Sequence, residues 1–488
     1  MPGIKRNLFF NFLLSLSQIL VPLVSIPYIS RVLDPEGIGR VGFMDAFTYY
    51  FIVIAEAGIM VYGIREIARL RDDESGLKKL VGELIALHVR TSVVSLVLYL
   101  LGVWMLWGKI GDVRLLYFSF AFLLMNAWAC EWYFIGRERF GYIALRSLLI
   151  RLAGLACIFL LINYPDDYHI YYAIIAGSGI LTGVWNISIL AIDTGFSIKG
   201  ADWKKHLSKV WVTYLISLLY SIPLYIDHVI LRLLSTSVAV GFYTFSIKLL
   251  RVSTAVISDS FLVFFPRISS HHAADEKQEV QTRLNQNFEV IFVLAIPLGM
   301  GIYLLADEIT QVFFGSAFSS ISRNLQALAF YPLLRCYSLF LSNPILIGHQ
   351  KEKLFLRNLA ASSIVFFMLA IAGSFYLADY GLCLALIGSD LFLVIVNYYS
   401  VRRTIPYLQL FSLRVVWQSL VAALLFVPVV YFIFEYSNDA LTRLWMSVLV
   451  CVFVYFLVLM FVFKNQALRS LAQNFRNKLS SSIPKKNE

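Results

Sequence analysis

Two cations, Lys248 and Arg251, lie three residues apart inside the segment 238–264, which is otherwise apolar enough to be buried in lipid. At this spacing both side chains fall on one face of a helix. A charged side chain at the centre of a bilayer costs about 2.5 to 3.5 kcal/mol even on scales taken from insertion experiments. We therefore expect this pair to point into a polar cavity and to bind an anion there.

Other intramembrane charges could act with this pair. Three arginines lie near mid-membrane in their own apolar segments: Arg90, Arg151 and Arg335. Carboxylates in similar segments are Asp45, Glu56, Asp227, Asp259 and Asp390. The pattern leaves two interpretations open, because such cations can line a lumen for an anionic substrate or can pair with the carboxylates and join helices.

Composition places these charges in a membrane protein. Hydrophobic residues make up 59% of the 488 residues and charged residues only 15%, whereas charged residues are about 25% of an ordinary soluble domain. The mean hydropathy is +0.75. Apolar runs of about 20 residues, the length that a bilayer requires of a helix, recur along the chain. The sequence predicts an all-α polytopic membrane protein.

Apolar runs and loop charges together predict the topology. We expect about fourteen transmembrane helices, at 8–29, 42–63, 80–106, 113–135, 143–163, 170–192, 210–233, 239–263, 289–306, 324–347, 358–378, 382–400, 415–436 and 443–463. Most of the 41 lysines and arginines fall in the loops on the side of the N-terminus. The positive-inside rule therefore places both termini in the cytoplasm, and the net charge of +11 is a topology signal that indicates no nucleic-acid partner.

A weak internal repeat predicts two lobes. Val41-Gly42-Phe43 opens the second predicted helix, and Val240-Gly241-Phe242 opens the eighth. Six helices per repeat keep both copies in the same orientation, as in some secondary transporters. We expect two six-helix lobes around a central cavity, residues 1–195 and 196–405. Residues 406–488 would add two helices and a basic amphipathic C-terminal tail that lies on the membrane surface.

Several short motifs resemble one family. The segment 27–39, PYISRVLDPEGIG, leads into Val41-Gly42-Phe43, and further matches are the segments 49–51, 56–58, 65–68 and 131–136. Together they resemble the Wzx-type flippases of O-antigen and other polysaccharides, within the multidrug, oligosaccharidyl-lipid and polysaccharide exporter superfamily. The resemblance is best in the N-terminal third of the chain. One departure is Asp34, where the family usually has glycine.

The resemblance implies transport of an undecaprenyl-diphosphate-linked oligosaccharide across the bacterial inner membrane by alternating access. Membrane lipids and this lipid-linked diphosphate would be the partners, and a polysaccharide polymerase and chain-length regulator are candidate partners too. The cations Lys248, Arg251, Arg90, Arg151 and Arg335 would meet the diphosphate. Tyr49 and Tyr243 could stack on sugar rings.

A coupling and gating set completes the predicted site. Protonation of Asp45 or Glu56 could be coupled to substrate binding, and Asp259 and Asp390 could take part in gating, although helix packing explains all four carboxylates equally well. Pro22 and Pro27 in the first helix could mark a hinge, because proline removes a backbone donor and kinks a helix.

The alternatives belong to other classes. A membrane-embedded polysaccharide polymerase or ligase would handle similar substrates, but it should carry a long external loop with catalytic residues, and no predicted external loop is long. A cation-coupled drug exporter of the same superfamily should favour an acidic pocket. We therefore expect no enzyme activity. The five cysteines show no paired spacing, and we expect no metal and no cofactor.

Overall fold

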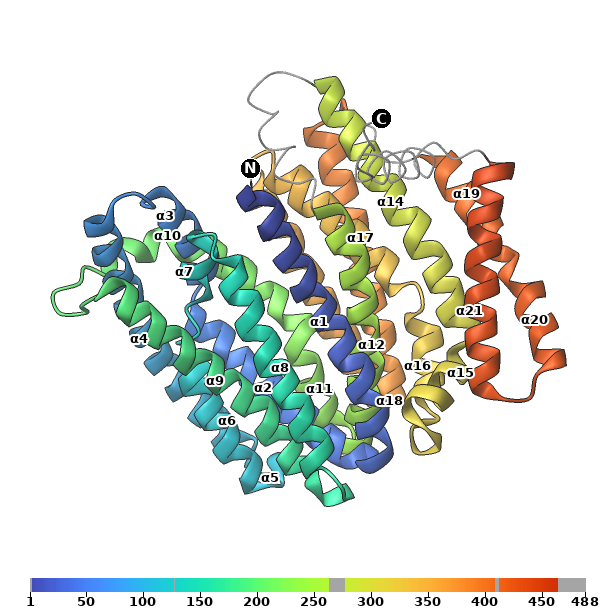
Figure 1. Cartoon of the computed structure of the whole chain (residues 1–488), viewed down its shortest axis with the longest axis horizontal. Helices are drawn as coiled ribbons and strands as arrows, with labels where there is room; N and C mark the ends of the chain where they lie inside the picture. The colour runs from blue at the N-terminus through green and yellow to red at the C-terminus, as the bar shows by residue number, and fades with distance from the viewer. Residues whose placement is uncertain (1, 127, 263–276, 409–411, 464–488) are drawn as a thin grey trace, which may run out of the picture. The chain divides into compact units, whose positions relative to one another are not determined.

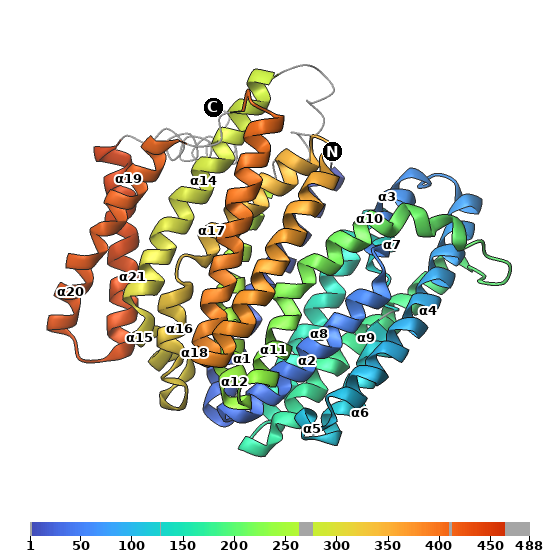
Figure 2. The same ribbon diagram turned by 180° about the vertical axis from the view of Figure 1, so that it is seen from behind.

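The computed structural model describes residues 2–126, 128–262, 277–408 and 412–463. These residues form helices and no β-strand, as Figures 1 and 2 show. Within these described residues, ten helices are long and apolar enough to cross a membrane, which confirms the all-α polytopic fold class. The number of fourteen spans stays a prediction. The tail beyond residue 463, predicted to be amphipathic, lies outside the described residues.

The structure describes twelve helices in residues 2–126 and 128–262. Their bounds are α1 Pro2–Val32, α2 Pro35–Glu56, α3 Ile59–Arg69, α4 Glu74–Met105, α5 Trp107–Ile110, α6 Val113–Asn126, α7 Glu131–Gly136, α8 Phe140–Leu161, α9 Tyr168–Thr194, α10 Lys204–Ser221, α11 Asp227–Leu234 and α12 Ser237–Leu262. A 3-10 turn η1, Pro165–Asp167, precedes α9, and a π-helical turn η2, Ile222–Ile226, joins α10 to α11.

The remaining helices follow residue 276. They are α14 Lys277–Leu304, α15 Ala306–Ile309, α16 Ile321–Leu328, α17 Tyr331–Phe340, α18 Glu352–Thr404, α19 Leu413–Leu424, α20 Phe426–Tyr436 and α21 Ala440–Leu457. Short π-helical turns at Thr310–Phe314, Leu341–Ile347 and Val458–Val462 and a 3-10 turn at Ser316–Phe318 complete this part.

The chain divides into two compact units. The first comprises Met1–Phe245, Phe313–Phe318 and Leu359–Leu386, and the second comprises Ser246–Val312, Ser319–Asn358 and Ile387–Glu488. The division cuts α12 and α18 within their lengths. It does not coincide with lobe boundaries at 195 and 405, so the two-lobe division stays a prediction.

Helix α2 is the central element of the first unit. It packs against α4, α6, α9, α10 and α11, and α10 and α11 run along it in Figure 2. Its apolar residues are spread around the helix and are not gathered on one face, which is typical of a helix surrounded by protein. Three glycines near its start, Gly37, Gly39 and Gly42, are buried and leave room for close neighbours.

Two of the predicted spans are broken by residues in the left-handed conformation. Ala57 (φ 47°) and Gly58 (φ 73°) separate α2 from α3, within the span predicted at 42–63. Cys130 (φ 47°) precedes α7, within the span predicted at 113–135. A left-handed residue ends the regular hydrogen-bond ladder, so each span becomes two shorter helices.

In α18, by contrast, each of two predicted spans is a helix of its own, and the two helices are joined across a kink. The 53 residues of α18 bend at Ala378 (φ 52°, ψ −129°), between the spans predicted at 358–378 and 382–400. On either side of the bend Gly373 and Gly381 touch backbone to backbone, because a Cβ built on Gly381 would lie 2.0 Å from the Gly373 carbonyl oxygen. The two limbs therefore meet without a separate loop.

Candidate functional site

A polar cavity of about 300 Å³ lies within the first unit. Segments of α2, α3, α4, α7 and α9 and the residues before α7 form its wall: Tyr49, Glu56, Ile59, Met60, His88, Ala129, Cys130, Glu131, Trp132 and Thr182. Both helix breaks border the cavity. Irregular backbone at membrane depth is tolerated where it lines a polar space inside the protein. The position of the two helix breaks beside this cavity fits that rule.

The two carboxylates of this cavity differ in their partners. Glu131 lies 2.5 Å from a guanidinium nitrogen of Arg146, which also donates a 2.5 Å hydrogen bond to Asn186. The Arg146 side chain is 3% exposed, so its charge is committed to this contact. Among the described residues Glu56 makes no hydrogen bond or ion pair. Glu56 is therefore the carboxylate that can take up and release a proton without breaking an ion pair.

A histidine borders the same cavity from α4. His88 is 6% exposed, and its Nε2 atom is buried with no hydrogen-bond partner among the described residues. A buried ring nitrogen without a partner is costly, and the cavity is the polar space into which it can bind water or a ligand. His88 was not among the predicted site residues.

Tyr49 lines this cavity and also contacts two aromatic residues on neighbouring elements. Its ring stacks on Tyr225 of η2, with centroids 5.3 Å apart and planes 6° apart, and meets Phe122 edge to face at 5.3 Å. One face of the Tyr49 ring is therefore covered by Tyr225 in this conformation. A sugar contact through this ring stays a prediction.

The predicted cations are distributed over both units. Lys248 and Arg251 are half-buried on the part of α12 that belongs to the second unit. Arg335 on α17, in the same unit, lies 3.5 Å from Asp390 on α18, with side chains 11% and 4% exposed. The structure thus brings a predicted substrate cation and a predicted gating carboxylate together as an ion pair.

Two predicted arginines belong to the first unit. Arg90 is exposed, donates to the Ala86 carbonyl at 2.7 Å and lies 4.8 Å over the ring of Trp203. Arg151 is half-buried on α8 and donates a 2.7 Å hydrogen bond to Ser17 on α1. Both arginines join neighbouring segments, and their contact with a diphosphate stays a prediction.

Tyr243, the second predicted sugar contact, is fully buried in the first unit. Its hydroxyl donates a 2.7 Å hydrogen bond to Asp227, which also accepts from His228 Nδ1 at 2.6 Å. In this conformation the tyrosine ring is covered by protein. The motif that could have indicated this contact is the adjacent Asp227-His228 pair in an apolar segment.

The remaining predicted residues lie on three helices. Asp45 is half-buried on α2, one turn before Tyr49. Pro22 and Pro27 lie inside α1, which continues through both. Asp259 belongs to α12, but its side chain lies outside the described residues. Coupling, gating and hinge roles for these four residues stay predictions.

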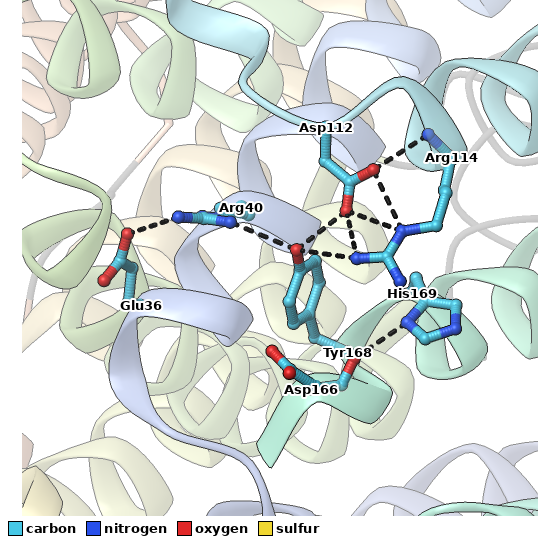
Figure 3. Close-up of polar contacts among 7 residues, drawn as sticks. All are labelled: Glu36, Arg40, Asp112, Arg114, Asp166, Tyr168 and His169. Atoms are coloured by element: carbon cyan, nitrogen blue, oxygen red, sulfur yellow. Dashed lines mark hydrogen bonds and ion pairs between the residues drawn. The ribbon is translucent and has the colours of Figure 1, made fainter. Parts of the chain in front are cut away.

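A second polar cluster joins the N-terminal ends of α2, α6 and α9 (Figure 3). Arg40 bridges Glu36 at 2.7 Å and Tyr168 at 3.1 Å, and Tyr168 donates to Asp112 at 2.7 Å. Arg114 completes the cluster with a 2.8 Å contact to Asp112. By the predicted topology this end faces away from the cytoplasm.

The Asp112 carboxylate stays ionised at all physiological pH values. Burial alone would raise its pKa, but hydrogen bonds from Arg114 and Tyr168 lower the pKa to about 2. A carboxyl whose folded pKa is lowered stabilises the fold above its ordinary pKa of about 3.9, and this contribution is lost only as the pH falls through the folded pKa. The hydrogen bonds and the ion pair of Asp112 are therefore kept in mild acid.

Sequence reasoning missed several of these residues. Glu131, Arg146 and Asn186 form the charged wall of the cavity, although the segment 131–136 was noted only for its family resemblance. An intramembrane glutamate directly followed by aromatic residues was the available signal. Arg146 and Asn186 carry no comparable signal, because only the packing of α8 and α9 brings them to Glu131.

Comparisons with known proteins agree with this fold. Residues 4–272, more than half of the chain, match the family model described as polysaccharide biosynthesis protein. A candidate O-antigen transporter of Escherichia coli (strain K12) is 20% identical over 395 residues, which are 80% of this chain and 94% of that protein.

Two solved structures have a similar fold. The lipid II flippase MurJ in an inward closed conformation is similar with a TM-score of 0.72 and 15% identity, over 94% of this chain and 99% of that one. An inward-facing multidrug resistance transporter of the MATE family has a TM-score of 0.59 and 16% identity, over 80% of this chain and 94% of that one. These matches confirm the resemblance seen in the N-terminal motifs. The chain belongs to the polysaccharide biosynthesis protein family.

Proposed function

We propose that this protein flips an oligosaccharide linked to undecaprenyl diphosphate from the cytoplasmic to the outer face of a bacterial inner membrane by alternating access. Its family membership and its similarity to an O-antigen transporter support transport of a lipid-linked glycan. The observation that carries the proposal is a pair of cations, Lys248 and Arg251, half-buried on one membrane-spanning helix.

The cations of α12 would bind the diphosphate. Phosphate oxygens accept charge-assisted hydrogen bonds from ammonium and guanidinium groups, and a cation inside the membrane persists where it has such a function. Arg335 is already compensated by Asp390 at 3.5 Å. Release of Arg335 from this ion pair would add a third cation when the diphosphate arrives.

The polyprenyl tail requires apolar surface, and the second unit provides an apolar cavity of about 320 Å³ between α14, α20 and α21. Its lining is Val293, Leu294, Pro297, Leu298, Gly301, Ile302, Leu305, Ile309, Phe426, Val430, Leu444, Val448, Cys451, Val452, Tyr455 and Phe456. A tail held by this cavity during flipping would remain in apolar surroundings.

Proton coupling would act through Glu56. This carboxylate borders a polar cavity and has no ion pair or hydrogen bond among the described residues, whereas its neighbour Glu131 is compensated by Arg146. Protonation and release at Glu56 can therefore follow the side of the membrane to which the cavity opens. This is the requirement of a proton-driven alternating-access carrier.

The diphosphate contact is tested by alanine substitution. In a strain without its own flippase, K248A/R251A should lower flipping of the lipid-linked oligosaccharide at least tenfold at equal protein level, because both phosphate contacts are lost. The matched control is K353A/R357A, which removes two exposed cations from α18 and should retain transport. Surface polysaccharide at the normal amount in the α12 double variant would overturn the diphosphate site.

The coupling site is tested separately in vesicles with an imposed proton gradient. Glu56→Gln mimics the protonated side chain, so it should abolish gradient-driven accumulation and leave exchange down the substrate gradient intact. Glu435→Gln, at an exposed position at the end of α20, serves as the control. If a protonophore leaves wild-type flux unchanged, proton coupling is excluded while the flippase function stands.

A further inference from the structure

A buried polar cluster joins the start of α10 to α3 and α4. Lys205 Nζ lies 2.7 Å from the Glu83 carboxylate, and His206 Nε2 lies 3.0 Å from the same carboxylate. The other ring nitrogen of His206 lies 2.8 Å from the Tyr62 hydroxyl. Tyr62, Glu83 and His206 are only 2 to 3% exposed. We call these four residues the α10 cluster.

The α10 cluster depends on hydrogen bonds that converge on one carboxylate, Glu83. A carboxylate accepts hydrogen bonds and never donates, so Nε2 of His206 carries a proton and Nδ1 accepts from Tyr62 when the ring is neutral. Glu83 thus has donors from two consecutive residues of α10. Its charge is compensated only while α10 remains in place.

The first half of α10 has few other buried side chains. Of the residues of α10 only His206, Val210 and Ser221 are buried, whereas Leu207 and Trp211 are 43% and 57% exposed. Segments with few buried apolar contacts are those that open at low free-energy cost. The α10 cluster therefore supplies much of what fixes the first half of this helix.

Irregular backbone flanks α10 on both sides. At its far end the π-helical turn η2 includes Pro223, which lacks a backbone donor, and π-helical turns mark positions where a helix departs from regular bonding. Before α10 the connection from α9 contains Gly195 (φ 52°) and Gly200 (φ 71°). Helix α10 can therefore move as a rigid segment between these two irregular stretches.

We propose that the α10 cluster is a latch on the cytoplasmic side, which holds the first half of α10 closed and releases it so that substrate can enter. The inference rests on the proposed function, because it adds a moving part to the same transport cycle. Glu83 is nine residues from the start of α4, a distance of roughly 13 Å along the helix. By the predicted topology water reaches this depth when α10 swings away, so the separated charges are hydrated and the opening is reversible.

The latch is tested by distance measurements between spin labels. Cysteines at Lys79 and Ser208, both exposed and outside the cluster, would carry the labels in a background whose five native cysteines are alanine. In wild-type protein without substrate we expect one short distance. Addition of lipid-linked oligosaccharide should produce a second, longer distance. A single distance under both conditions shows a static anchor and overturns the latch.

Substitutions then assign the motion to the cluster. Glu83→Gln should produce the longer distance without substrate, because the carboxylate that Lys205 and His206 bind is lost. The charge exchange E83K/K205E should restore the short distance. The matched control is Glu138→Gln, which breaks the exposed 3.2 Å ion pair with Arg71 and should leave the distance unchanged.

The outcomes separate the latch from the function. An unchanged distance in Glu83→Gln, or an equal lengthening in Glu138→Gln, contradicts the latch whatever the protein transports. A substrate-dependent opening in a protein that fails to flip glycan in vesicles supports the latch and contradicts the flippase proposal.

Discussion

The one residue that departs from the family motif, Asp34, begins the central helix of the first unit. Its side chain accepts a 2.6 Å hydrogen bond from the Gly37 backbone, in the extended conformation of an N-cap (φ −79°, ψ 165°). Pro35 follows at the first helical position, where a missing donor has no cost. The departure is therefore a functional cap for α2, and glycine, the usual family residue, is also an accepted cap.

This cap gives a prediction at the residue scale. Asp34→Ala should lower the free energy of unfolding by about 1 kcal/mol, whereas Asp34→Gly should cost only a few tenths. Thermal unfolding in detergent, followed by tryptophan fluorescence, measures both variants. Equal losses in the two would show that the side chain has a role beyond capping.

Only part of the candidate site could be predicted at this scale. A charge in an apolar segment is visible in sequence, so Glu56, Arg335 and Asp390 were found. Which charges form ion pairs could not be predicted, because the 3.5 Å contact of Arg335 with Asp390 and the 2.5 Å contact of Arg146 with Glu131 depend on which helices pack together. Spacing along one chain contains no such information.

At the scale of elements, α2 and α12 cross with their backbones in close contact within the first unit. A Cβ built on Gly241 would lie 2.0 Å from the Pro35 carbonyl oxygen, and one on Gly39 would lie 1.7 Å from the Ser237 carbonyl oxygen. Small residues let two helix backbones approach in this way. The repeated Val-Gly-Phe motif, noted as a sign of internal duplication, thus has a packing role at its second copy.

The crossing predicts a strong effect of a single methyl group. Gly241→Ala forces the two backbones apart and should cost about 1 to 3 kcal/mol, as overpacking does. The matched control is Gly177→Ala on α9, where a Cβ meets nothing within 4 Å. Unfolding midpoints of the two variants in detergent measure the difference, and a stable Gly241→Ala protein would show that α2 and α12 can separate freely.

Element boundaries were predicted where composition alone decides them. The apolar segments became helices, but the breaks at Ala57 and Cys130 were missed, since neither alanine nor cysteine favours φ near 47°. Tertiary packing around the polar cavity selects these conformations. Strain at such positions is often found beside functional sites, which agrees with the position of both breaks.

For the whole molecule, composition was sufficient to predict a polytopic all-α fold, because apolar length and scarcity of charge follow directly from the bilayer. The arrangement of the units was not accessible, since α12 and α18 each contribute residues to both. A repeat in sequence suggests duplicated lobes but does not say which helices exchange contacts.

The apolar cavity of the second unit gives a prediction about the whole substrate. A Cβ on Gly301 meets nothing within 4 Å, so Gly301→Leu can fill the cavity without a clash at the backbone. Flipping of a substrate with a full-length polyprenyl tail should fall severalfold, whereas a short-chain analogue should be flipped as by the wild type. Equal losses for both substrates would exclude this cavity as the site of the tail.

The glycine pair at the bend of α18 has a practical consequence for mapping sidedness. The Gly373 and Gly381 backbones touch. An epitope or glycan acceptor inserted near Ala378 would therefore separate the two halves of α18, and its accessibility would be measured in a distorted protein. The short turn around Gly108 and Gly111, where added atoms meet open space, is the safer place for such a reporter.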